Sequence, residues 1–196
     1  MMRNTITKSA LLATGLMLSV QSSAEPTAEA LGYTCAGCHG TNGASTGNAI
    51  PSLAGLSEGY LIGAMNAYRE DERSSTIMGR IAKGYTEEQI ESMATFFSAQ
   101  PVHANINQKY DATKARAGAK LHDKYCSSCH TEAGAEPEDD AGLLSGNSKL
   151  FMKYTLADFH DGSRDMPKRM EKKMKKMLKK DPDALGKLVN YYGSGK

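Results

Sequence analysis

The chain of 196 residues carries 24 basic and 22 acidic side chains, is 40% hydrophobic, and contains four cysteines and no tryptophan. Its length suits one large domain or two small ones. So close a balance of charge gives no reason to expect a nucleic-acid partner, and no segment after residue 24 is long and apolar enough for a membrane helix.

Residues 1–24 are typical of a cleaved secretion signal. Arg3 and Lys8 supply positive charge, a mostly apolar run follows over residues 10–20, and three small residues before position 25 suit cleavage. A bilayer span needs about 20 apolar residues, so retention as an anchor is disfavoured. We therefore expect a periplasmic protein that begins near residue 25 and has no stable membrane insertion.

The remaining chain divides into two units of opposite charge. Residues 25–105 hold 4 basic and 9 acidic side chains, whereas residues 106–196 hold 18 basic and 13 acidic ones. Such a polar molecule can orient itself on a partner during encounter, although scattered solvated charge explains the counts equally well. Each unit is small, so a large apolar cofactor would supply core that the sequence lacks.

The first unit opens with the stretch YTCAGCHGTNG, in which Cys35, Cys38 and His39 form a Cys-x-x-Cys-His motif. Two cysteines three residues apart at a helix start lie on one side and can bond one flat ligand at two points. The adjacent histidine can then reach a metal at the centre of that ligand. This pattern is the signature of covalent haem c attachment.

Later elements of the first unit predict a second iron ligand and a closing helix. Met78 lies in the irregular stretch SSTIMGR, where a thioether can be aimed inward, and a sulfur ligand favours Fe(II). Pro51 places a backbone carbonyl near the imidazole N–H of His39. The apolar periodicity over residues 86–97 predicts a helix, and residues 99–113 are interpreted as a linker.

The second unit repeats this order. A helix predicted over residues 114–125 leads into the stretch YCSSCHTEAG, in which Cys126, Cys129 and His130 form the second motif. Gly142 stands where the first unit has its proline, so we expect the two haems to differ in environment and potential. Two such motifs in equivalent repeats predict two covalently bound haem c groups.

Met166, in the stretch GSRDMPK, is the expected iron ligand of the second unit. His160 is a competing ligand, but it would break the repeat. A very basic helix follows, and its apolar stripe is interpreted as packing rather than ligation. That stripe consists of Met170, Met174, Met177 and Leu178.

Other uses of four cysteines fit this sequence less well than haem attachment. A thioredoxin-like dithiol needs a βαβ context, and no alternating β pattern is visible. A four-cysteine zinc site leaves both adjacent histidines unexplained. Two disulfides suit a secreted protein, but each would close a very short loop and add little stability.

Taken together, these motifs resemble class I cytochromes c. The chain is similar to dihaem cytochromes of the c-four type and, more closely, to the dihaem cytochrome subunit of flavocytochrome c sulfide dehydrogenase. The closer resemblance is carried by STIMGRIAKGYTEEQIESMATFFSAQP, YCSSCH, DDAGLLSG and SRDMPKRM, whereas the Lys-rich KRMEKKMKKMLKKDPD departs from that pattern. The resemblance implies an all-α fold of two tandem cytochrome c domains, residues 25–105 and 106–196.

The resemblance also implies a function. The chain would transfer electrons without being an enzyme, accepting them from a flavoprotein that oxidises sulfide and passing them to a redox acceptor of a respiratory or photosynthetic chain. The alternative is a free c-four type shuttle that serves a terminal oxidase. A dihaem peroxidase would need an open iron site, which methionine ligands at both irons would close.

Overall fold

The computed structural model describes residues 25–139 and 141–195, so the predicted secretion signal lies outside the described residues. This part of the chain is helical and contains no strand, only two isolated β-bridges, which confirms the all-α prediction. None of its helices has the length and apolarity needed to cross a membrane. The elements are α1 (Ala28–Tyr33), α2 (Ala36–His39), η1 (Thr41–Gly43), α3 (Glu58–Arg69), α4 (Met78–Ala82), α5 (Glu87–Ser98), α6 (Ala112–Tyr125), η2 (Glu132–Gly134), α7 (Lys149–Asp161), α8 (Lys168–Lys180) and α9 (Ala184–Tyr192).

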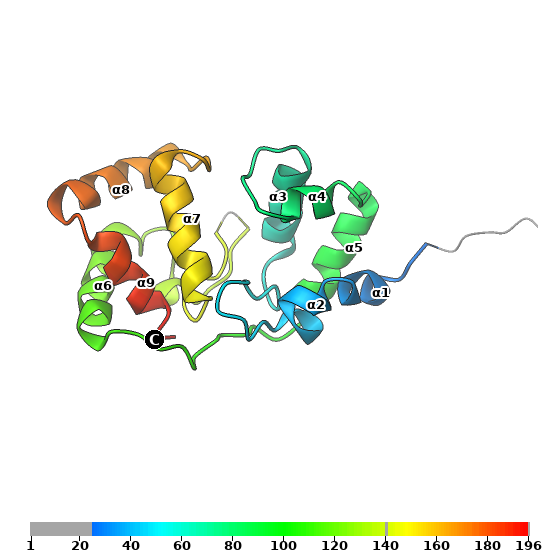
Figure 1. The fold of residues 1–196 in the computed structure, drawn as a ribbon, viewed down its shortest axis with the longest axis horizontal. Coiled ribbons are helices and arrows are strands. Elements are labelled where there is room, and N and C mark those ends of the chain that lie inside the picture. The colour runs from blue at the N-terminus through cyan, green and yellow to red at the C-terminus, as the bar shows by residue number, and fades with distance from the viewer. Residues whose placement is uncertain (1–24, 140, 196) are drawn as a thin grey trace, which may run out of the picture.

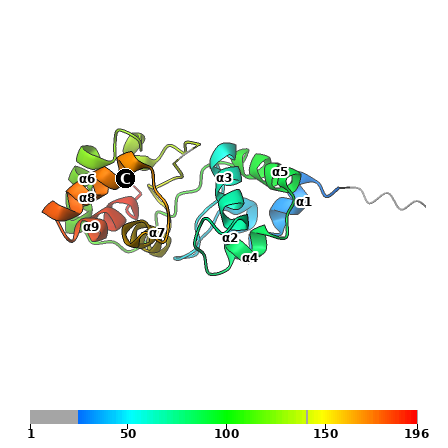
Figure 2. The same ribbon diagram turned by 90° about the horizontal axis from the view of Figure 1, so that it is seen from above.

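The helices form two groups that lie side by side. Elements α1 to α5 make one group and α6 to α9 the other, and both views separate them (Figures 1 and 2). The groups touch where the N–H of Leu150, in the first turn of α7, donates to the carbonyl of Asn48 in a loop of the first group at 3.1 Å. We call the two groups the first and second units.

Helix α5, which closes the first unit, and helix α6, which opens the second, both begin where a side chain caps them. Thr86 accepts the N–H of Gln89 in a capping box that starts α5, and the residues that form its apolar period, Ile90, Met93, Ala94 and Phe97, are all buried. Helix α6 starts two residues earlier than predicted because the Asp111 carboxylate accepts the N–H groups of Thr113 and Lys114 at 2.7 and 2.9 Å. The non-helical linker therefore ends at Asp111.

Helices α3 and α7 were not identified from the sequence. Only Leu61 is fully buried in α3, and only Met152 and Leu156 in α7. Apolar stripes that short give a weak periodic signal.

Each unit has its own hydrophobic core, and the two backbones repeat in detail. Gly43 and Gly134 both have positive φ, 77° and 79°, and their carbonyls accept the N–H groups of Leu53 and Leu144 at 2.8 and 2.9 Å. The first core consists of Leu31, Leu56, Leu61, Ile90, Met93, Ala94 and Phe97 with Leu143 from the second unit; the second consists of Tyr125, Met152, Leu156, Met174, Met177, Ala184, Leu188, Val189 and Tyr192.

Close packing of α6 against α9 gives a first testable prediction. A Cβ added at Gly118 would lie 2.3 Å from the carbonyl oxygen of Lys187, so Gly118→Ala forces the two helices apart. We expect it to lower the free energy of unfolding by about 1–3 kcal/mol in urea titrations. Gly63→Ala is the matched control, since Gly63 lies in α3 with open space around it, and alanine there should stabilise by roughly 0.5–1 kcal/mol. Equal effects of both substitutions would contradict this account.

Candidate functional site

The two cysteine motifs have the same backbone geometry. In the first, Cys35 is the N-cap of α2 and its carbonyl accepts the N–H of His39 at 2.9 Å. In the second, the carbonyl of Cys126 accepts the N–H of His130 at 3.0 Å, although turns rather than a helix follow α6 there. Each histidine is therefore held one helical turn from the first cysteine of its motif.

The state of the thiols disfavours the other uses of cysteine. All four are free, with Cys35 and Cys126 half-buried and Cys38 and Cys129 exposed. Burial raises the pKa of the Cys35 and Cys126 thiols. No group of three or more His, Cys, Asp or Glu side chains within residues 25–139 and 141–195 is arranged to hold a metal ion. The arrangement of the side chains thus disfavours a shared zinc site and a disulfide framework. The absence of strands from the described residues disfavours a dithiol on a βαβ unit.

His39 is oriented as predicted from Pro51. The residue is 9% exposed, and its Nδ1 donates to the Pro51 carbonyl at 2.8 Å, which leaves Nε2 as the ring nitrogen available to a metal. Burial lowers the pKa of His39. A buried, neutral imidazole held by its second nitrogen is the form in which histidine binds a metal.

Met78 does not lie in an irregular loop, as the sequence indicated, but is the first residue of the short helix α4. Its side chain is half-buried and does not belong to the first core, whereas Met93 lies in that core and Met65 packs against it. The flanking side chains of Ile77 and Ile81 are 46% and 38% exposed. Met78 therefore lies at an apolar part of the surface.

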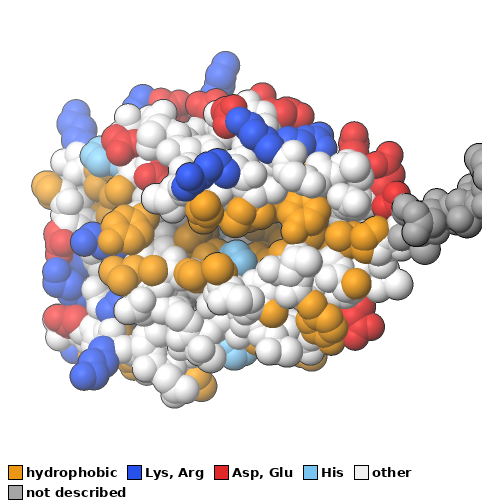
Figure 3. All heavy atoms as spheres, turned by 45° about the vertical axis from the view of Figure 1, so that its right-hand side comes forward, with side chains coloured by type: hydrophobic (Ala, Val, Ile, Leu, Met, Phe, Trp, Pro, Cys, Tyr) orange, Lys and Arg blue, Asp and Glu red, His pale blue; other side chains and the backbone are white. Residues whose placement is uncertain are grey.

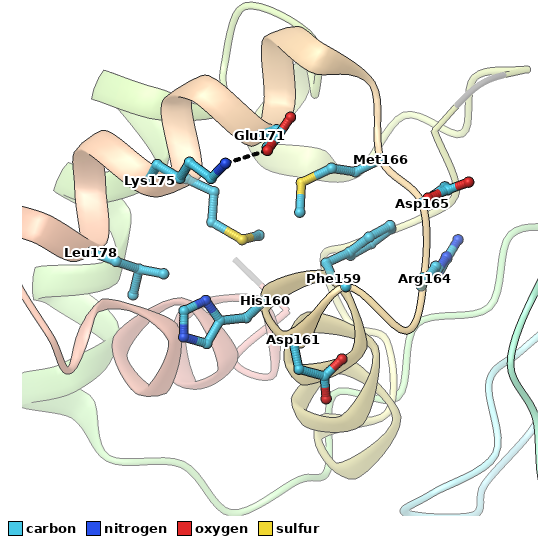
Figure 4. A pocket seen from close by; sticks show the side chains of 11 residues that line it. Phe159, His160, Asp161, Arg164, Asp165, Met166, Glu171, Lys175 and Leu178 are labelled. Carbon is cyan, nitrogen blue, oxygen red and sulfur yellow. Dashed lines mark hydrogen bonds and ion pairs between the residues drawn. The ribbon is translucent and has the colours of Figure 1, made fainter.

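Met166 lies in the loop before α8, as predicted, and lines a cavity of about 510 Å³. Figure 4 shows its thioether directed into this cavity, with His160 on the far side. Phe159, Met174 and Leu178 complete the apolar part of the lining. Met174 was interpreted as packing only, yet it is both buried in the second core and part of the lining, so it joins His160 as a competing ligand.

The residues present fit a large flat cofactor with a metal at its centre. The second unit offers a cavity between α7 and α8 whose lining is part apolar and part charged, and hydrophobic side chains form a band bordering a hollow on the face shown in Figure 3. Two thiols and one imidazole per unit suit covalent attachment and axial ligation of haem c, which supplies one-electron redox chemistry when bound.

One feature of the second unit was missed from the sequence. His122 and Tyr192 are each 2% exposed, and the Tyr192 hydroxyl lies 2.9 Å from His122 Nδ1 and also hydrogen-bonds Cys126. The first unit has Leu31 and Phe97 at the matching places, four residues before the first cysteine and second in the closing aromatic pair. Aligning the two repeats position by position would have revealed this exchange of an apolar pair for a polar one.

Both units match known families. Residues 27–100 match the family described as Cytochrome c, and residues 113–191 match the one described as Cytochrome C oxidase, cbb3-type, subunit III. A solved structure of reduced cytochrome c4 from Pseudomonas stutzeri, 23% identical, superimposes with a TM-score of 0.71 over 85% of this chain and 97% of that one. That likeness shows the same two-unit fold.

Curated relatives agree with these matches. The cytochrome subunit of sulfide dehydrogenase from Chlorobaculum tepidum is 47% identical over 73 residues, which are 37% of this chain and 66% of that protein, just under two thirds. Cytochrome c4 of Pseudomonas aeruginosa is 25% identical over 169 residues, 82% of this chain and 84% of that protein. Cytochrome c-554(548) of Halomonas halodenitrificans is 36% identical over 70 residues, 34% of this chain and 84% of that protein.

The two cysteine motifs share one backbone geometry, and each unit is similar to a cytochrome family. The chain belongs to the cytochrome c family and is a dihaem cytochrome c, with two covalently bound haem c groups, that transfers electrons.

Proposed function

We propose that this chain is the periplasmic cytochrome subunit that accepts electrons from a sulfide-oxidising flavoprotein and passes them to a respiratory or photosynthetic chain. The observation that carries the proposal is the 47% identity to the cytochrome subunit of a sulfide dehydrogenase. A reduced flavin holds two electrons and each haem accepts one, so two haems together can reoxidise the flavin fully.

The proposal assigns a role to each motif residue. Residues 1–24 direct export, and residues 25–105 and 106–196 are the two domains. In each domain the two cysteines hold one haem through thioether bonds, and one histidine and one methionine bind its iron. The ligand sets are Cys35, Cys38, His39 and Met78 in the first domain, and Cys126, Cys129, His130 and Met166 in the second.

The first unit is the better candidate for the flavoprotein interface. Tyr33 near the first motif and Ile77 and Ile81 beside Met78 are 47%, 46% and 38% exposed, and such apolar side chains suit the desolvated centre of a stable interface. The second unit carries the basic helix α8, whose exposed lysines suit brief, electrostatically guided exchange with an acceptor. We therefore propose that the first haem receives electrons and the second releases them.

The test combines complex formation with rapid mixing. The purified cytochrome should elute together with a sulfide-oxidising flavoprotein from the same organism, and sulfide should reduce the first haem before the second. Ile77→Asp should weaken this complex at least tenfold, because it places a charge in an apolar interface. Tyr154→Asp is the matched control, since Tyr154 is 56% exposed but lies on the second unit.

Two outcomes would overturn the proposal. If no complex elutes and only quinol-oxidising membranes reduce the haems, the chain is a free shuttle of the cytochrome c4 kind. If Tyr154→Asp weakens the complex and Ile77→Asp does not, the flavoprotein docks on the second unit and the order of electron transfer is reversed.

A further inference from the structure

A chain of polar side chains crosses the core of the second unit and ends at its cysteine motif. His122 belongs to α6 and Tyr192 to α9, and each is 2% exposed. Nδ1 of His122 lies 2.9 Å from the Tyr192 hydroxyl. The same hydroxyl hydrogen-bonds the sulfur of Cys126, which packs against the second core. The chain therefore reaches one of the two cysteines that attach the second haem.

Apolar side chains take the same places in the first unit. Leu31, four residues before the first motif, stands in place of His122, and Phe97, second in the closing aromatic pair of α5, stands in place of Tyr192. Leu31 and Phe97 are 5% and 3% exposed and belong to the first core. An apolar pair is thus enough to join the two helices, so packing alone does not explain the polar pair of the second unit.

Haem attachment fixes the direction of the hydrogen bonds in this chain. When a cysteine thiol adds to a vinyl group of haem, the sulfur bonds to one vinyl carbon and the thiol hydrogen passes to the other. The resulting thioether sulfur accepts hydrogen bonds but has no hydrogen to donate. Tyr192 must then donate its single hydroxyl hydrogen to Cys126, and its oxygen must accept a hydrogen bond from Nδ1 of His122. The imidazole thereby orients the phenol.

A donor at this sulfur affects the equilibrium between Fe(II) and Fe(III). It withdraws electron density from the porphyrin through the thioether, and an electron-poor porphyrin favours Fe(II). The burial of His122 and Tyr192 strengthens the effect, because hydrogen bonds are electrostatically stronger in the protein interior than in water and those in a chain polarise one another.

We propose that His122 and Tyr192 are positioning residues of the second haem. Nδ1–H of His122 holds the Tyr192 hydroxyl, which donates to the thioether sulfur of Cys126 and raises the reduction potential of that haem. The first haem lacks this donor pair, since Leu31 and Phe97 stand in its place. The chain therefore shifts the potentials in the direction that electron transfer from the first haem to the second requires. The inference rests on the two attached haems and not on the flavoprotein partner.

The test measures the potentials of the intact holoprotein, without flavoprotein or sulfide. Tyr192→Phe removes the donor and keeps the ring, so the one-electron equilibrium of the second haem should shift about two- to tenfold toward the oxidised form, or roughly 18–59 mV. The equilibrium of the first haem, which Met78→Ala identifies, should stay in place. Tyr191→Phe is the matched control and should shift neither equilibrium, since it removes a hydroxyl from the neighbouring, half-buried tyrosine whose ring also lies beside His122.

Variants of His122 test the direction of the chain. His122→Leu should shift the second haem in the same sense as Tyr192→Phe but by a smaller factor, because Tyr192 keeps its hydroxyl and loses only the group that orients it. His122→Asn should recover part of this shift, since the amide N–H replaces the Nδ1–H donor. NMR of the histidine nitrogens in the reduced, diamagnetic holoprotein should find a hydrogen on Nδ1 of His122.

Three results would overturn the proposal. A His122 imidazole with its hydrogen on Nε2 alone would mean that Tyr192 donates to Nδ1, and its hydroxyl would then have no hydrogen for Cys126. Unchanged potentials in Tyr192→Phe, with haem absorbance retained, would leave the pair with a role in packing alone. Equal shifts in Tyr192→Phe and Tyr191→Phe would assign the effect to the general polarity of the core and not to the bond with the sulfur.

Discussion

Replacing Met78 with alanine is expected to lower the reduction potential of one haem by roughly 0.1–0.3 V, a fraction of the ~0.8 V range that axial ligation covers. The reason is that a thioether stabilises Fe(II), so its loss favours Fe(III) and opens the iron to small ligands. Met166→Ala should do the same at the other haem. The two measurements are a potentiometric titration and the appearance of a cyanide-binding haem.

Core methionines provide the control. Met93 is 4% exposed in α5, and Met93→Leu should leave both potentials and the absorption of both methionine-ligated irons unchanged. If Met166→Ala keeps two methionine-ligated haems, the sulfur comes from α8, either from Met174 in the cavity or from Met170. If His160→Ala instead opens the second iron, histidine is the ligand there.

The features that could be predicted from the sequence are those formed by residues close together in the chain. Helix α5 follows from a cap and a 3.6-residue period, and the bond from His39 to Pro51 follows from spacing along one loop. Both motifs could be interpreted because haem attachment needs a short, contiguous pattern. In such cases all the interacting groups lie within about a dozen residues of one another.

What could not be predicted depends on pairs distant in the chain. Arg73 and Arg164 are both compatible with solvent exposure, and only the contact between the units reveals that they meet. Met174 has the spacing of a packing residue, and nothing in the period of α8 distinguishes a position that faces a core from one that faces a cavity beside it. The same holds for His122, whose partner lies 70 residues away.

His122 and Tyr192 provide the second prediction, which concerns stability and its dependence on pH. Either His122→Leu or Tyr192→Phe should lower the free energy of unfolding by about 1–3 kcal/mol, because each removes the hydrogen bond between two buried polar groups and keeps one of those groups buried. The double variant recreates the apolar pair Leu31 and Phe97 of the first unit, so it should cost less than the sum of the single changes. Urea titrations of the four proteins at pH 7 give the coupling free energy.

The dependence on pH has a definite sign. Burial lowers the pKa of His122, and the neighbouring Asp123 carboxylate acts in the opposite direction but is outweighed. The unfolded chain therefore binds a proton at His122 more readily than the folded one. The stability that His122 contributes is full above the unfolded pKa of about 6.5 and falls below it, by at most ~1.4 kcal/mol per pH unit.

Comparing the wild type with the double variant between pH 7 and pH 5 isolates this group, because His39, whose pKa burial also lowers, is present in both proteins. Carboxylates whose pKa folding lowers, such as Asp111 and Asp181, lose their contribution only nearer their unfolded value of 3.8, below this range. Burial raises the pKa of Tyr192 well above its ordinary value, so the phenol stays protonated throughout. The wild type should lose stability toward pH 5 more steeply than the double variant. Identical slopes would mean that His122 takes up its proton as readily in the folded protein as in the unfolded chain, and the pair would then become an imidazolium donating to the Tyr192 hydroxyl as the pH falls.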